Sequence, residues 1–287
     1  MSSGVTRSVA LCWIRRDLRL ADNETLHAAL QHADQVTPVY VLDPILLERY
    51  AGTKRVAFLF SAIRQLDADL RARGSRLVVR RGDAVDALGR LVQETGATAV
   101  YAQEDWTPHA RQRDAKVAAR LPLHLVGSPT LRPPGTVLKR DGQPYTVFTP
   151  FSRRWREYTP PSASDLHSVP SVIPTPDISS LPIPAEPVLS PGVRFPASET
   201  EAQNRLRAFT EGRDAPIYRY AKERDRLDLD ATSRLSPYLR FGLLSARQAL
   251  ATAYRAQEAA SEAVSYTHLT LPTNRVAGGG GGGGGGG

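Results

Sequence analysis

The stretch Ser8-Val-Ala-Leu-Cys-Trp-Ile14 decides the fold. It is an uninterrupted apolar run with β-branched and aromatic residues, which is typical of a parallel strand buried on both faces. Four similar runs follow, each preceded by a segment with helical spacing. Strands that alternate with helices predict an α/β fold with a doubly wound, mostly parallel sheet. The further strands are expected at residues 36–42, 76–80, 97–101 and 121–126, and the helices at 23–32, 54–73, 84–94 and 109–120.

The loops that follow these strands are the expected ligand-bearing loops of the sheet, because ligands bind beyond the carboxyl ends of parallel strands. They begin near Arg15, Asp43, Gly82 and Gln103. No Gly-x-Gly-x-x-Gly fingerprint follows the first strand, where residues 15–23 read Arg-Arg-Asp-Leu-Arg-Leu-Ala-Asp-Asn. This absence argues against an oxidoreductase that binds its dinucleotide through that fingerprint.

Composition sets the remaining bounds. With 287 residues, 41% of them hydrophobic, the chain is long enough for two domains. It contains no run of eighteen apolar residues and no cleavable leader pattern, so we expect a cytoplasmic protein with no membrane contact. We also expect a monomer. Cys12 is the only cysteine, which excludes an internal disulfide and predicts a buried thiol. The formal charge of +8 is compatible with a polyanionic partner.

The second half of the chain changes character. Ten prolines fall between residues 159 and 196, which predicts an extended linker without a core of its own. Helical spacing returns at 202–209, after Asp214 and at 245–255. We therefore expect an α/β domain at 1–158, a linker at 159–199 and the start of an all-α domain at 200–263.

Thr232-Ser-Arg-Leu-Ser236 carries three hydroxyls and one guanidinium in five residues, and Pro237 follows directly. Ser is a favoured N-cap and Pro is favoured at the first helical position, so Ser236 should cap a helix whose first residue is Pro237. Hydroxyls and an arginine around the positive end of a helix can hold a phosphate. The alternative interpretation is an ordinary capped helix without a ligand.

Three segments together resemble the DNA photolyase/cryptochrome family, most closely a bacterial cyclobutane pyrimidine dimer photolyase. They are residues 13–23, residues 145–155 (Tyr-Thr-Val-Phe-Thr-Pro-Phe-Ser-Arg-Arg-Trp) and Tyr220 followed twelve residues later by the hydroxyl-rich segment. The resemblance implies that the helical domain binds FAD. It also implies that Arg224 contacts the DNA backbone. The implied FAD contacts are Tyr220, Thr232, Ser233, Arg234, Leu235 and Ser236.

The function implied is that of a deoxyribodipyrimidine photolyase, a carbon–carbon lyase. In such enzymes reduced FAD donates an electron, under light, to a pyrimidine dimer flipped out of the DNA. The cofactor carries the chemistry, so we assign no catalytic side chain, and no metal is expected. Two alternatives stay open: a cryptochrome that signals through the same flavin, and a non-enzymatic nucleotide-binding α/β protein.

Two segments are interpreted further. Folate-carrying members of the family present an Asn-Glu pair where this chain has Pro108 and His109. The chain therefore resembles members that carry a deazaflavin, another flavin or no antenna chromophore, and if a second chromophore is present we expect a deazaflavin or flavin rather than folate. Arg153, Arg154 and Arg156 are interleaved with aromatic residues, a pattern that nucleic-acid surfaces share. We instead interpret residues 145–155 as an aromatic cluster that closes the α/β domain.

The end of the chain does not look like a folded protein. Residues 278–287 are ten glycines. Residues 264–273 can be back-translated into a transposon-based sequencing adapter, so we interpret 264–287 as a non-native tail. Because the family's remaining FAD-domain helices are not in this sequence, we expect this chain to show little FAD binding and no repair.

Overall fold

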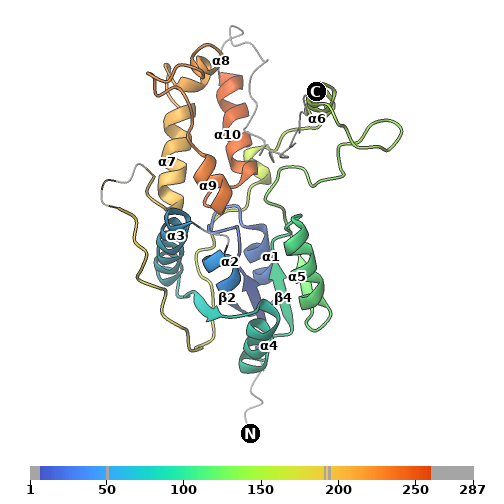
Figure 1. Cartoon of the computed structure of the whole chain (residues 1–287), viewed down its shortest axis with the longest axis vertical. Coiled ribbons are helices and arrows are strands. Elements are labelled where there is room, and N and C mark those ends of the chain that lie inside the picture. The colour runs from blue at the N-terminus through green and yellow to red at the C-terminus, as the bar shows by residue number, and fades with distance from the viewer. Residues whose placement is uncertain (1–6, 50–51, 191, 193–194, 260–287) are drawn as a thin grey trace, which may run out of the picture.

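Five parallel strands form one sheet in the computed structural model, which describes residues 7–49, 52–190, 192 and 195–259. The strand order is β3-β2-β1-β4-β5, as in a doubly wound sheet. Figure 1 shows this sheet in the half of the molecule that carries the N-terminus. The predicted α/β class and all five predicted strands are confirmed. Their bounds are β1 Val9–Trp13, β2 Gln35–Leu42, β3 Val78–Arg81, β4 Ala99–Ala102 and β5 Leu123–Leu125.

Helices cover both faces of the sheet, and the alternation of side chains along β1 explains why. Ala10 and Cys12 pack with helices α1 (Glu24–His32) and α3 (Thr53–Arg71). Leu11 and Trp13 pack with α4 (Ala84–Thr95) and α5 (Pro108–Ala118) on the other face. Cys12 is fully buried, and burial raises the pKa of its thiol well above the usual value. The negative charge of the Asp17 carboxylate raises this pKa further, by a smaller amount. The buried thiol was predicted correctly.

Two helices were not predicted. The short helix α2 (Pro44–Arg49) follows β2, and α6 (Phe148–Arg156) lies within the segment interpreted as an aromatic cluster. That interpretation was wrong, because α6 buries none of its residues and Phe148 is 54% exposed. Figure 1 shows α6 standing apart from both the sheet and the other helices.

The proline-rich segment runs in extended form along the α/β part, with one turn of 3-10 helix, η1 (Ala163–Asp165). It covers the free edge of β3: Val79 donates its N–H to the Ser180 hydroxyl at 2.8 Å, and Leu181 donates to the Val79 carbonyl at 3.1 Å. Ile173 is fully buried in the core. The connector thus protects an edge strand that would otherwise be open to pairing.

Helices make up the last described part of the chain. They are α7 (Glu199–Thr210), η2 (Pro216–Tyr218), α8 (Tyr220–Glu223), α9 (Ser236–Phe241) and α10 (Ala246–Ala259). Leu206, Tyr238 and Leu243 belong to the same buried cluster as the α1 and α3 side chains. The helical part and the α/β part therefore share one hydrophobic core.

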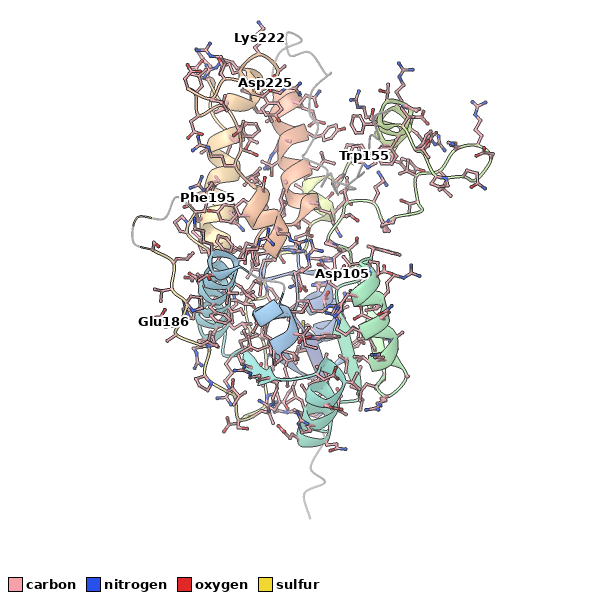
Figure 2. The ribbon with its side chains drawn as sticks, viewed as in Figure 1. Asp105, Trp155, Glu186, Phe195, Lys222 and Asp225 are labelled. Carbon is pink, nitrogen blue, oxygen red and sulfur yellow. The ribbon has the colours of Figure 1, made fainter. Side chains whose placement is uncertain are left out.

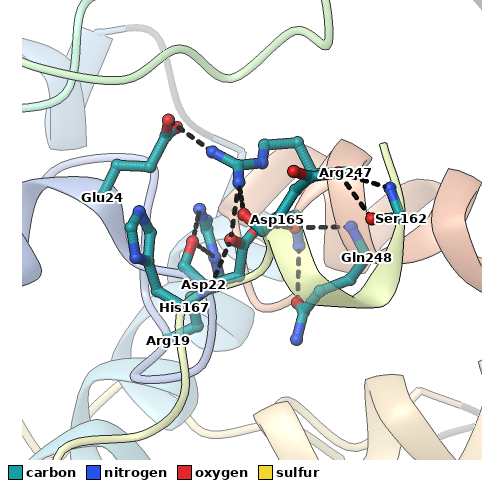
Figure 3. Close-up of polar contacts among 9 residues, drawn as sticks. Arg19, Asp22, Glu24, Ser162, Asp165, His167, Arg247 and Gln248 are labelled. Atoms are coloured by element: carbon teal, nitrogen blue, oxygen red, sulfur yellow. Dashed lines mark hydrogen bonds and ion pairs between the residues drawn. The ribbon is translucent and has the colours of Figure 1, made fainter. Parts of the chain in front are cut away.

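The loop after β1 forms the polar contact between these two parts. Arg19 donates to the Gly242 carbonyl at 3.1 Å, and Asp22 accepts a hydrogen bond from the Ser245 hydroxyl at 2.5 Å. Arg247 of α10 pairs with Glu24 at 2.6 Å (Figure 3). Asn23, rather than either aspartate of the loop, caps α1 by accepting from the Leu26 N–H.

Glu199 is the buried carboxylate of this contact. Its two oxygens accept the N–H groups of Leu20 at 2.7 Å and Ala21 at 2.9 Å. Burial raises the pKa of Glu199 above its usual value, and the two N–H donors oppose that rise. A raised folded-state pKa means that folding favours the protonated carboxyl, so this contribution to stability is fully present below the unfolded pKa and is lost as pH rises through the folded value.

We therefore predict that Glu199→Gln changes the pH dependence of stability. The melting temperature of the wild type minus that of the variant should fall as the pH is raised from below the unfolded pKa of Glu199 through its folded value. Asp17, whose pKa burial also raises, is present in both proteins and cancels. Glu199→Ala should cost about 2–5 kcal/mol across the range, because it leaves two buried N–H groups unpaired. A pH-independent difference between wild type and Glu199→Gln would contradict the prediction.

Three sequence-based expectations concern the tail, a membrane span and a metal site. Residues 264–287, interpreted as a non-native tail, lie outside the described residues. Among those that are described, no helix has the length and apolar character to cross a membrane. The same residues contain no group of three or more His, Cys, Asp or Glu side chains arranged to hold a metal ion.

Candidate nucleotide-binding site

A cavity of about 350 Å³ opens between α7, α9 and α10 in the helical part. Its volume lies within the range of small-molecule sites in proteins. All six residues expected to contact FAD line it, although they come from two separate segments of the chain. The complete lining is Phe195, Leu206, Phe209, Thr210, Tyr220, Thr232, Ser233, Arg234, Leu235, Ser236, Pro237, Ala249, Leu250 and Ala253.

One wall of the cavity is apolar and aromatic. Tyr220, half-buried at the start of α8, meets Phe209 of α7 edge to face with ring centroids 5.8 Å apart. Ala249 and Ala253 lie one helical turn apart on α10 and leave room opposite these rings. Phe195, labelled in Figure 2, lies where α7 meets the α/β part. Such a wall excludes water and suits a planar ring system.

The other wall is polar, and its hydroxyl groups are available to bind a ligand. The hydroxyls of Thr232, Ser233 and Ser236 form no hydrogen bond with any residue that the structure describes. Arg234 lies between them, and among the described residues it pairs only with the exposed Asp230, at 3.0 Å. Three free hydroxyls and one cation at a cavity rim can donate to an anionic group such as a diphosphate.

Arg234 has a left-handed backbone, with φ of +50°. An arginine in this region costs about 1–2 kcal/mol relative to its ordinary conformations. Leu235 and Tyr238, which follow this turn, are buried, so the packing of the surrounding fold compensates for that cost. This packing keeps the guanidinium at the cavity.

Ser236 was expected to be the N-cap of a helix, and this expectation was wrong by one position. Helix α9 begins at Ser236 itself, Leu235 is the capping residue and no side chain caps the helix. Pro237 stands one place inside the helix start. Because Ser236 does not cap, its hydroxyl is free to face a ligand.

Arg224 lies apart from the cavity, at the carboxyl end of α8. Its side chain is 39% exposed and approaches Asp225 at 3.5 Å. Asp225 and its neighbour Lys222 mark the outer end of the helical part in Figure 2. The structure thus brings the six expected cofactor contacts together and leaves Arg224 on the outer surface.

The carboxyl edge of the sheet was the other expected ligand site. The guanidinium carbons of Arg15 and Arg113 both lie over the Trp13 ring, each 4.7 Å from its centroid. Arg15 also pairs with Asp114 at 2.6 Å. Burial lowers the pKa of Arg113, and the charge of Arg15 lowers it further. The space enclosed by the loops after β1 and β4 leaves no room even for a water molecule. As its side chains lie here, this edge does not fit a chromophore.

Sequence reasoning missed the cavity's apolar wall. Leu206, Phe209, Ala249 and Ala253 were recognised only as positions in helices. The available signal was the pair of alanines four residues apart on α10, which marks a helix face with unfilled space beside it. Nothing in the sequence indicates which aromatic residue occupies that space.

A doubly wound sheet, joined by a covering connector to a helical part with a polar-rimmed cavity, defines a two-part protein of the α/β plus all-α kind. The chain belongs to the DNA photolyase family, whose model, described as DNA photolyase, matches residues 10–172.

Individual relatives agree with this membership. The deoxyribodipyrimidine photo-lyase of Streptomyces griseus is 35% identical over 88% of this chain and 56% of its own length. An uncharacterized 31.6 kDa protein of Synechococcus sp. is 36% identical over 88% of this chain and 90% of its own length. The crystal structure of a class III photolyase from Agrobacterium tumefaciens is 27% identical, with a TM-score of 0.79 over 93% of this chain and 56% of that one. The chain thus spans about half the length of the photolyases it matches.

Proposed function

We propose that this protein takes part in the light-dependent repair of cyclobutane pyrimidine dimers, as a deoxyribodipyrimidine photolyase that binds FAD. The observation that carries the proposal is the cavity in the helical part. It gathers Tyr220, Arg234 and three unbonded hydroxyls from two separate segments around one space. Membership of the photolyase family supports FAD as the occupant.

The residues present fit a flavin nucleotide. In our proposal the hydroxyls of Thr232, Ser233 and Ser236 donate to the diphosphate, and Arg234 balances its charge. Tyr220 packs its ring against the nucleotide, and the buried Leu235 anchors the loop. When bound and reduced, FAD supplies a light-driven electron to the pyrimidine dimer. The protein's own part is to bind, to orient and to exclude water.

DNA is the proposed substrate, and Arg224 is a proposed backbone contact. Its exposed position at the outer end of α8 supports the role, because a phosphate can reach it. We further propose a monomer located with its DNA in the cytoplasm. The proposed domains are 1–158, a connector at 159–199 and a helical domain at 200–263, which is supported by the change from strands to helices across the connector.

A second chromophore, a deazaflavin or flavin rather than folate, stays part of the proposal on the strength of Pro108 and His109. It would require the carboxyl edge of the sheet to open. Arg16 and Asp105, which approach to 3.8 Å across that edge, are the side chains that would separate.

A repair assay tests the proposed function. The protein encoded by the whole gene is purified in the dark, reconstituted with FAD, reduced, and mixed with DNA containing thymine dimers. Under near-ultraviolet and blue light we expect the dimers to disappear, whereas a dark control should keep them. A protein encoded by the whole gene that takes up no FAD would contradict the proposal. One that binds FAD, responds to light and leaves dimers intact would favour the cryptochrome alternative.

A further inference from the structure

Residues 131–158, which we call the arm, form a structured segment that includes α6 and projects from the rest of the molecule (Figure 1). Leu138 and Pro144 pair as an antiparallel bridge, and the rings of Tyr145 and Phe151 meet edge to face at 6.2 Å. The Tyr158 hydroxyl donates to the Thr136 carbonyl at 3.0 Å. These contacts join the beginning, the tip and the helix of the arm, although α6 buries no residue. The arm is therefore a structured surface and not a loose loop.

The arm concentrates positive charge. It carries six basic and two acidic side chains, a net charge of +4, which is half of the +8 of the whole chain. Two of the cations are engaged: Arg132 lies over the Tyr158 ring at 4.2 Å, and Arg154 pairs with Glu157. The other four side chains form no ion pair or hydrogen bond with the residues that the structure describes. They are Lys139, Arg140, Arg153 and Arg156.

Aromatic side chains are interleaved with these cations. Trp155 stands between Arg154 and Arg156 in the sequence and is labelled in Figure 2 at the base of α6. Phe148 is 54% exposed at the start of the helix. Free cations attract phosphates, and exposed rings stack with bases or pack against sugars. The combination is that of a nucleic-acid contact.

We propose that the arm is a sequence-independent docking surface for the DNA backbone, separate from the FAD cavity and from Arg224. The inference rests on the proposed function for the identity of its partner and adds a site to it. Figure 1 shows α6 and α8 toward the same end of the long axis, beyond the sheet. A duplex lying across that end can meet the arm as well as Arg224, which follows α8.

Val147 of the arm is 61% exposed, and a second copy of the chain is the other partner that could bury such an apolar side chain. The charge of the arm argues against that partner. Two arms of net charge +4 would repel each other, whereas a polyanion gains from releasing counterions. The observations therefore favour DNA over self-association.

The test removes three free cations of the arm, in Arg140→Gln/Arg153→Gln/Arg156→Gln. The probe is a short fluorescent, undamaged DNA duplex, titrated with the chain without FAD at about 50–200 mM salt. We expect affinity at the low-salt end to fall by about 10-fold or more. The slope of log affinity against log salt should become shallower by about 2–3, because each lost phosphate contact removes about 0.9.

A matched control removes three exposed cations elsewhere, in Lys54→Gln/Arg90→Gln/Arg111→Gln. It lowers the net charge equally and should weaken binding by less than about 3-fold, since long-range attraction is screened. Equal losses in both triple variants, or no loss in the arm variant, would overturn the proposal. So would a wild-type dimer in sedimentation that Phe148→Ser dissociates. Because the probe carries no lesion and no FAD is present, failure here leaves the repair proposal standing, and failed repair leaves this one standing.

Discussion

Replacing Gly242 by alanine is expected to disrupt the contact between the helical part and the α/β part. Gly242 ends α9 with a left-handed backbone, φ +70°, and accepts a hydrogen bond from Arg19 through its carbonyl. A Cβ atom built at Gly242 would lie 1.7 Å from the Arg16 carbonyl oxygen and 2.7 Å from the Asp17 Cα. Both are backbone atoms, so no side chain can turn away to make room.

The expected cost is the sum of two effects. The left-handed conformation costs alanine about 1–2 kcal/mol, and forced overpacking costs about 1–3 kcal/mol. Together they should lower the melting temperature by about 10 °C for a chain of this size. Thermal unfolding followed by circular dichroism measures the change.

Gly96→Ala is the matched control. Gly96 also ends a helix, α4, with φ of +67°, but no atom lies within 4 Å of its added Cβ. It should cost only the conformational part, about 1–2 kcal/mol. If both variants lost the same stability, the close approach at Gly242 would not matter and the contact between the two parts would not depend on it.

The sheet could be predicted from the sequence because its signal is local. An apolar run such as residues 8–14 has only one stable environment, between two layers of helices. The same logic failed for residues 145–155, where aromatic content suggested a buried cluster. Burial of an aromatic residue depends on what lies opposite, and the described contacts of α6, such as that of Phe151 with Tyr145, bury none of its residues.

The sequence predicted the polar half of the candidate site and, of its apolar wall, Tyr220 alone. Hydroxyls and an arginine in five consecutive residues are visible in the sequence, but the cavity also needs Phe209 and Ala253 from other helices. Their contribution arises from packing between α7 and α10. The loop at residues 15–23 shows the same limit, because its sequence does not reveal that Arg19 and Asp22 bind Gly242 and Ser245 of the helical part.

Removing the three free hydroxyls of the cavity is expected to abolish most nucleotide affinity without changing stability. The variant is Thr232→Val/Ser233→Ala/Ser236→Ala. Each hydroxyl that donates to a phosphate contributes about 1 kcal/mol, so three should contribute about 3 kcal/mol, or about 150-fold in Kd. Folding should not suffer, because none of the three is hydrogen-bonded within the described structure. Isothermal titration calorimetry of the protein encoded by the whole gene with FAD measures the ratio of the two Kd values.

The control removes a Thr and two Ser hydroxyls that are exposed, form no hydrogen bond with the described residues and lie outside the cavity, in Thr146→Val/Ser168→Ala/Ser171→Ala. It should bind FAD as the wild type does. Repeating both titrations with ADP locates the effect: ADP carries a diphosphate without the flavin, so an equal loss of affinity for ADP assigns the hydroxyls to the diphosphate. A loss confined to FAD would place the three hydroxyls against the flavin instead. Equal affinities of wild type and variant for both ligands would show that these hydroxyls do not contact the ligand.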